Sequence, residues 1–184
     1  RELGAKAVEE SDFKRDFLFV TMGQTDVSVT KEMEEVNLKE NIVDLGYVPH
    51  LEAIAWQKRA DLLLLPLRKE KEAKAILTGK FFEYLASGSK ILAFGPRNSN
   101  LGDAMRETQC GTICEYENGG SIRKAIDAAY EYFKKKMSEV YKKQVNDLEL
   151  LVPNFIIASA IIHFDETSPH LHIVGVPIKY KNKN

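Results

Sequence analysis

The stretch from Thr78 to Pro96 constrains the fold more than any other, because it predicts a helix and a strand in direct succession. Thr78 suits the N-cap of the helix, and Gly79 leaves the backbone N–H groups of the first turn open to an approaching group. Gly88 suits the left-handed backbone position that follows a helix. The apolar run 91–94 then predicts a strand that is covered on both faces, as strands of parallel sheets are.

The helix between Gly79 and Gly88 carries two ionic residues that its position does not explain. Lys80 lies in the first turn, where the helix dipole favours negative charge, and Glu83 lies among aromatic residues. A bound phosphate would account for Lys80, and Glu83 would then accept hydrogen bonds from ribose hydroxyls. The alternative is that both side chains lie on the solvated face of the helix. Its apolar face is expected to consist of Phe81, Phe82, Tyr84 and Leu85.

Short apolar runs alternate with helical patterns along the rest of the first 133 residues. Helices are expected at 3–10, from Thr30 onward, at 51–59 and at 98–108, and a turn at 118–120. Further strands are expected at 17–20, 42–45, 62–65 and 112–116. This alternation predicts an α/β fold, with βαβ units that form a Rossmann-like parallel sheet and helices that flank it. Ligands of such sheets bind outside the carboxyl ends of the strands.

Three segments of this region resemble the donor-binding half of the GT-B glycosyltransferases. They are 78–96, Gly46-Tyr47-Val48-Pro49-His50 and the run 60–66, and the resemblance covers about 12–133. It implies a domain, residues 1–133, that binds a nucleotide-sugar donor for glycosyl transfer. Many members of that family carry a second glutamate where this chain has Ala75, so the resemblance does not extend to the contacts with the donor sugar. The implied donor-binding residues are Glu83 at the ribose, Thr78, Gly79 and Lys80 near the diphosphate, and Val48 and His50 near the base.

Beyond this domain an apolar repeat of three or four residues predicts one long helix, from about Ser121 to Leu151. Its central lysine run, 134–136, is read as a solvated face. The charge balance changes here, since residues 1–133 carry a net charge of −4 and residues 134–184 carry +3. These changes predict a second domain at 134–184. They also predict that the chain passes from sequence related to one protein family to sequence related to another between Glu131 and Tyr141.

The last part of the chain predicts an antiparallel hairpin with three histidines. Strand-like runs at 155–164 and 170–176 enclose a loop rich in turn residues. His170 and His172 point to one face because strand side chains alternate, and His163 would join them from the neighbouring strand. Three imidazoles leave an open coordination position, as in catalytic metal sites, and Glu166 would orient a ligand or a metal-bound water. The alternative is a histidine-rich surface hairpin that binds no metal.

The sequence His163-Phe-Asp-Glu-Thr-Ser-Pro-His-Leu-His172 resembles the histidine–hydrophobe–histidine (HUH) motif of the MobV or Pre plasmid mobilisation relaxases, and the resemblance covers about 137–184. It implies that a divalent metal (Mn, Mg or Zn) is held by His163, His170 and His172 and supported by Glu166. In that family the metal polarises the scissile phosphate of a DNA strand while a tyrosine or histidine attacks. The nucleophile would lie upstream, on a strand that this chain does not match, so no catalytic residue is assigned. Single-stranded DNA would bind weakly and in a salt-sensitive manner.

Three hypotheses remain open for the whole chain. The first is a glycosyltransferase-type module that binds a nucleotide sugar with little or no transfer. The second is a fragment of a metal-dependent DNA relaxase, and the third is an inactive fusion of two incomplete domains. Cys110 and Cys114 are read as free thiols rather than as a zinc site, which suits a reducing compartment. Because no apolar run approaches the length of a membrane span and no signal peptide opens the chain, a cytoplasmic location is expected.

Overall fold

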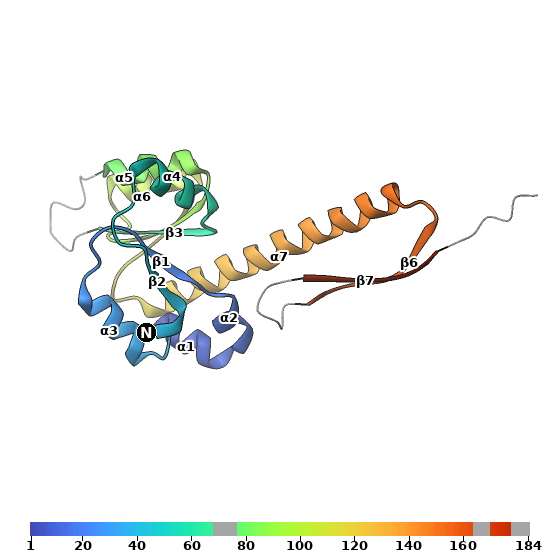
Figure 1. Ribbon diagram of the computed structural model, residues 1–184. Coiled ribbons are helices and arrows are strands. Elements are labelled where there is room, and N and C mark those ends of the chain that lie inside the picture. Colours follow the sequence, from blue (N-terminus) through green and yellow to red (C-terminus); the bar gives the residue numbers. More distant parts are fainter. Residues whose placement is uncertain (68–76, 164–169, 178–184) are drawn as a thin grey trace, which may run out of the picture. The chain divides into compact units, whose positions relative to one another are not determined.

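The computed structural model describes residues 1–67, 77–163 and 170–177 (Figure 1). The chain divides into two compact units, which are described separately below. The N-terminal unit is Arg1–Tyr130 and the C-terminal unit is Glu131–Asn184. The junction between them lies within one long helix, α7 (Gly119–Leu151). Among the described residues, no helix combines the length and the apolar composition that a membrane span requires.

Helices and short strands alternate through the N-terminal unit, as the sequence predicts. Two helices come first, α1 (Glu2–Glu9) and α2 (Ser11–Asp16). The elements that follow are β1 (Phe19–Thr21), α3 (Val27–Glu35), the 3-10 turn η1 (Lys39–Asn41), β2 (Ile42–Asp44), α4 (His50–Arg59), β3 (Leu62–Pro66), α5 (Gly79–Ser87), β4 (Lys90–Phe94), α6 (Asn100–Thr108) and β5 (Gly111–Cys114).

The described strands of the N-terminal unit all pair in parallel, and helices connect and flank them, which confirms the expected fold class. The strands form two sheets, β1-β2 and β3-β4-β5, rather than one continuous sheet. Leu64 of β3 pairs with Leu92 of β4, and Ala93 of β4 pairs with Ile113 of β5. Because β1 and β2 have three residues each and none of these residues is buried, they offer little apolar surface to the larger sheet.

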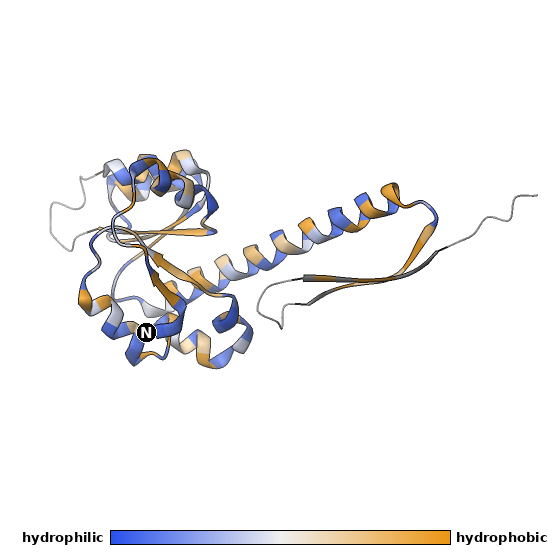
Figure 2. Ribbon diagram, in the orientation of Figure 1, coloured by the Kyte–Doolittle hydropathy of each residue, from blue (hydrophilic) through white to orange (hydrophobic). Residues whose placement is uncertain are grey.

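The hydrophobic core of the N-terminal unit lies around the central strand β4. Ile91, Leu92 and Ala93 are at most 2% exposed, which confirms that this strand is covered on both faces. Helix α5 contributes Phe81 to the same cluster, and α6 contributes Leu101 and Met105. In Figure 2 the strands are mainly hydrophobic, whereas the helices alternate between hydrophobic and hydrophilic residues.

Phe82 is 55% exposed and does not belong to the core face of α5, so its assignment to that face is wrong. The partly buried residues of α5 that pack against the core are Tyr84 and Leu85. These residues lie three and four positions after Phe81 and share its helix face, whereas Phe82 is rotated away from it.

Side-chain caps move two helix starts away from their predicted positions. Helix α3 begins at Val27 rather than near Thr30, because the Asp26 carboxylate accepts a hydrogen bond from the Ser28 N–H at 2.8 Å. The segment 118–120 is a helix start rather than a turn, because the Asn118 side chain accepts a hydrogen bond from the Ser121 N–H at 2.9 Å. The expected first strand begins two residues late, at Phe19, since α2 precedes it.

The C-terminal unit contains the rest of α7 and two antiparallel strands, β6 (Phe155–His163) and β7 (His170–Pro177). The pairing runs from Phe155 opposite Pro177 to His163 opposite His170, with an irregularity between Ile157 and Ser159. The long helix and the antiparallel strand pair are therefore confirmed.

Candidate functional site

The register of β6 and β7 places the three histidine positions of the predicted metal site on one face. His163 pairs directly with His170, and Ile161 pairs with His172. Opposed residues of an antiparallel pair share a face, and so do residues two apart along a strand. Positions 163, 170 and 172 therefore lie together on the backbone, although Glu166 falls outside the described residues.

The face that carries the histidine positions includes exposed apolar residues. Ile161 and Val174 lie on it and are 55% and 63% exposed. Leu171 and Ile173 lie on the opposite face and are half-buried. Among the side chains that the structure describes, no group of three or more His, Cys, Asp or Glu could hold a metal ion. Cys110 and Cys114 are free thiols, as expected.

The predicted donor-binding residues of α5 surround an open helix start. The Thr78 hydroxyl accepts a hydrogen bond from the Phe81 N–H at 3.3 Å, so the expected cap is present. Among the described residues, and leaving aside its chain neighbours and the backbone of its own helix, no heavy atom lies within 4 Å of a Cβ built on Gly79. Lys80 and Glu83 are both exposed. Because α5 returns from the end of β3 to the start of the parallel strand β4, this helix start lies on the carboxyl side of the sheet.

Helix α4 contacts α5, and the second group of predicted residues lies at the start of α4 and in the loop before it. His50 is the first residue of α4 and is exposed, and Val48 lies half-buried in the preceding loop. In the described part of the chain, neither residue has a hydrogen bond or ion pair with the α5 residues of the predicted site. Ala75, at the place of the second glutamate of many GT-B enzymes, lies outside the described residues.

Glu83 has a partner on α4 that sequence reasoning did not find. The Gln57 side-chain amide donates a hydrogen bond to the Glu83 carboxylate, with 3.4 Å between Nε2 and Oε2. A single glutamine on a short helix gives no signal in the sequence, since its contact depends on how α4 packs against α5. Burial, and then the negative charge of Glu83, raise the pKa of the neighbouring Tyr84 hydroxyl.

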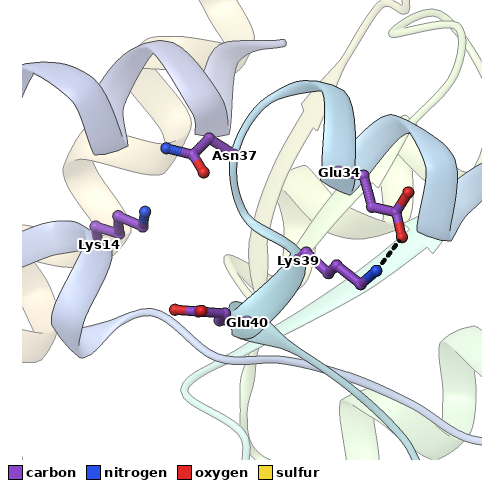
Figure 3. Close-up of a pocket in the computed structure, with 5 residues that line it drawn as sticks. All are labelled: Lys14, Glu34, Asn37, Lys39 and Glu40. Atoms are coloured by element: carbon purple, nitrogen blue, oxygen red, sulfur yellow. Dashed lines mark ion pairs between the residues drawn. The ribbon is translucent and has the colours of Figure 1, made fainter.

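A polar pocket of about 370 Å³ is lined by none of the predicted site residues (Figure 3). Its lining is Lys14, Glu34, Asn37, Lys39 and Glu40, from α2, α3 and η1 and the turn between the last two. Two lysines and two glutamates line it, and Lys39 pairs with Glu34 at 2.7 Å. Since its own charges balance, the pocket indicates no particular ligand.

Comparison with known proteins gives a family match and matches among solved structures. Residues 122–184, less than half of the chain, match the plasmid recombination enzyme family. The curated proteins give no significant match. A crystal structure of WaaG, a glycosyltransferase involved in lipopolysaccharide biosynthesis, matches at 16% identity and a TM-score of 0.48. The match covers 69% of this chain and 35% of that one, so the chain spans about a third of the length of WaaG.

The two comparisons differ in what they establish. A structural similarity of the degree found for WaaG does not by itself assign an activity. The family match covers most of α7 and both strands of the hairpin, where the histidine motif lies. It confirms the resemblance stated for the end of the sequence: residues 122–184 of this chain are similar to plasmid recombination enzymes.

Proposed function

We propose that the β6–β7 hairpin binds one divalent metal ion through His163, His170 and His172, with support from Glu166, and contacts a phosphate of single-stranded DNA through it. The observation that carries this proposal is the register, in which His163 is directly opposite His170. The family match supports DNA as the partner, since that family acts in plasmid recombination.

The residues fit such a metal in type and in backbone placement. Imidazole nitrogens are ligands for Mn²⁺ and Zn²⁺, and a set of three leaves a coordination position open. The Cβ atoms of opposed residues lie about 5 Å apart. Residues two apart along a strand are separated by roughly 7 Å. The exposure of Ile161 and Val174 indicates that a ligand can reach this face.

A divalent cation bound there would polarise a phosphate oxygen and neutralise part of its charge. The hairpin's own contribution is to hold three ligands on one rigid strand pair. No nucleophile is assigned, because Tyr141 is only 9% exposed and Tyr180 falls outside the described residues. We therefore propose metal-dependent DNA binding rather than strand cleavage.

Fluorescence anisotropy with a labelled single-stranded oligonucleotide tests this proposal. Binding is expected only when Mn²⁺ is added, and it should weaken steeply as salt is raised. The His170→Ala/His172→Ala variant should lose the Mn²⁺-dependent part. His50→Ala is the matched control, because His50 is the one histidine of the sequence outside the hairpin motif and lies in the N-terminal unit. Equal DNA binding with and without Mn²⁺ would contradict the proposal.

As a second function, we propose that the N-terminal unit binds a nucleotide-sugar donor. The observation that favours it is the open, Thr78-capped start of α5 beside the exposed Lys80 and Glu83. The first N–H groups of α5 and Lys80 would bind the diphosphate. Glu83 would accept hydrogen bonds from the ribose hydroxyls, and the loop that contains Val48 and His50 would contact the base.

Isothermal titration with UDP and with ADP tests this second function. Glu83→Ala should abolish nucleotide binding, whereas the change of the exposed Glu52 on α4 to alanine should leave it unchanged. A wild-type protein that binds neither nucleotide would overturn donor binding. If it also failed to bind Mn²⁺, the third hypothesis, an inactive fusion, would hold.

A further inference from the structure

A buried glutamine joins α4 to the predicted ribose-binding glutamate of α5. Gln57 is only 8% exposed. Its amide nitrogen donates to the Glu83 carboxylate, while its amide oxygen is buried without a partner among the described residues. A buried side chain with one satisfied and one unsatisfied polar atom requires an explanation.

The hydrogen bond to Glu83 explains the orientation of the Gln57 amide and its unpaired oxygen. A carboxylate only accepts hydrogen bonds, so the amide must present its NH₂ group to Glu83 and turn its oxygen away. An apolar residue of similar size would fill the same space and leave no acceptor unpaired. In the described part of the chain, the hydrogen bond to Glu83 is therefore the only contribution that distinguishes this glutamine from a leucine or methionine.

A second hydrogen bond joins α4 to the end of α5 without involving the Gln57 side chain. The Ser89 hydroxyl donates to the Gln57 carbonyl oxygen at 2.8 Å. Ser89 follows Gly88, which ends α5 in the left-handed conformation with a φ of 80°. Gln57 is thus bonded to the end of α5 through its backbone and to the middle of α5 through its side chain.

We propose that Gln57 is a positioning residue for Glu83. It holds Oε2 of the exposed carboxylate and leaves Oε1 to accept from the two vicinal hydroxyls of a ribose. This role rests on the proposed nucleotide binding. A glutamate that is already held loses less conformational freedom when a ligand binds, so the hydrogen bond should improve affinity about three- to tenfold.

Nucleotides with and without the ribose hydroxyls provide the test. Wild-type protein is titrated with UDP and ADP and with their 2′,3′-dideoxy counterparts, and it should prefer the hydroxyl-bearing forms. Gln57→Leu should weaken binding of those forms about three- to tenfold and leave the dideoxy forms unaffected. Gln57→Met is the second variant, in case leucine impairs folding. Ser89→Ala is the matched control, since it removes a bond between the end of α5 and α4 without touching Glu83.

Four outcomes would overturn the role. An unchanged ribose preference in both Gln57 variants would overturn the positioning role of Gln57 but not the proposed nucleotide binding. An equal loss for hydroxyl-bearing and dideoxy forms, or the same loss of preference in Ser89→Ala, would show that Gln57 acts only by packing the two helices. Absence of any binding by the wild-type protein would overturn the proposed nucleotide binding and this role with it.

Discussion

The Lys6 ammonium lies 2.8 Å from the Asp127 carboxylate, so a buried charge joins α1 to the first part of α7. Lys6 is 2% exposed and also lies 2.8 Å from the Glu10 carboxylate. Its ammonium is 5.1 Å from the Phe13 ring centroid and 5.2 Å from that of Tyr130. A lysine is tolerated at such depth only when its charge is paired, and here two carboxylates and two aromatic rings surround it.

We predict that replacing Asp127 destabilises the N-terminal unit more than replacing Lys6 does. Asp127→Ala leaves a buried ammonium with Glu10 as its remaining carboxylate and should destabilise the N-terminal unit by about 1–3 kcal/mol. Lys6→Met keeps an apolar stem in place and leaves two partly exposed carboxylates that water can solvate, so it should cost less than about 1 kcal/mol.

Urea unfolding followed by the fluorescence of Trp56 measures both variants. Trp56 is the only tryptophan of the chain and lies in the N-terminal unit, so it reports on this unit alone. A greater loss for Lys6→Met than for Asp127→Ala would contradict this account of the ion pair.

The Asp127 carboxyl group should make the N-terminal unit sensitive to acid. Its hydrogen bond to Lys6, followed by that to Arg123, holds its pKa below the ordinary value of 3.8, although burial acts in the opposite direction. A group whose pKa is lowered by folding stabilises the protein above the ordinary pKa. This contribution is complete above about pH 5 and is lost as the pH falls through the lowered pKa.

Urea midpoints measured from neutral pH into acid check this prediction. Asp127→Asn should show a shallower decline below about pH 5 than the wild type, because one proton-linked contribution is gone. The change of the exposed Glu52 to glutamine is the control and should leave the decline unchanged. Parallel curves for wild type and Asp127→Asn would refute the linkage.

A second bond ties α7 to α2. The Tyr130 hydroxyl donates to the Asp16 carboxylate at 2.7 Å, and the Tyr130 ring meets Phe13 edge-on at 5.2 Å between centroids. Burial, and then this hydrogen bond, raise the pKa of Tyr130. Tyr130→Phe keeps the ring contact and loses the bond, so it should cost about 1 kcal/mol. Asp16→Asn should lower the pKa of Tyr130 in an NMR titration, and an unchanged pKa would contradict the assignment.

Local signals predicted those parts of the fold that depend on neighbouring residues. The Thr78 cap, the Gly88 stop and the buried run after it were predictable because each acts within a few residues. The hairpin was predictable from two strand-like runs and a turn-rich loop. The start of α3 was misplaced because Asp26, four residues before Thr30, provides the cap instead.

The remaining features depend on residues that are distant in the sequence. Gln57 meets Glu83, and Lys6 meets Asp127, only after the helices have packed. Neither contact leaves a periodic or compositional pattern that sequence reasoning can use. The division of the strands into two sheets is a tertiary feature of the same kind.

Substitution of Gly79 by alanine is expected to affect stability and nucleotide binding in different ways. Among the described residues outside its chain neighbours and its own helix backbone, a Cβ at this position would meet no heavy atom within 4 Å, and alanine favours helices over glycine. Gly79→Ala should therefore leave the stability unchanged or raise it by up to about 1 kcal/mol. In the proposed nucleotide site, the same methyl group would stand where the diphosphate is expected at the helix start, so the affinity for UDP or ADP should fall. Increased stability together with unchanged affinity would show that the nucleotide does not bind at α5.

The most direct test of the central claim is isothermal titration of metal-stripped protein with Mn²⁺. The account predicts one site per chain in the wild type and in His50→Ala, and no binding in His170→Ala/His172→Ala. Circular dichroism of the variants shows whether the fold is kept. Retention of the site in the double variant, or absence of any site in the wild type, would contradict the claim that the β6–β7 hairpin is a metal centre.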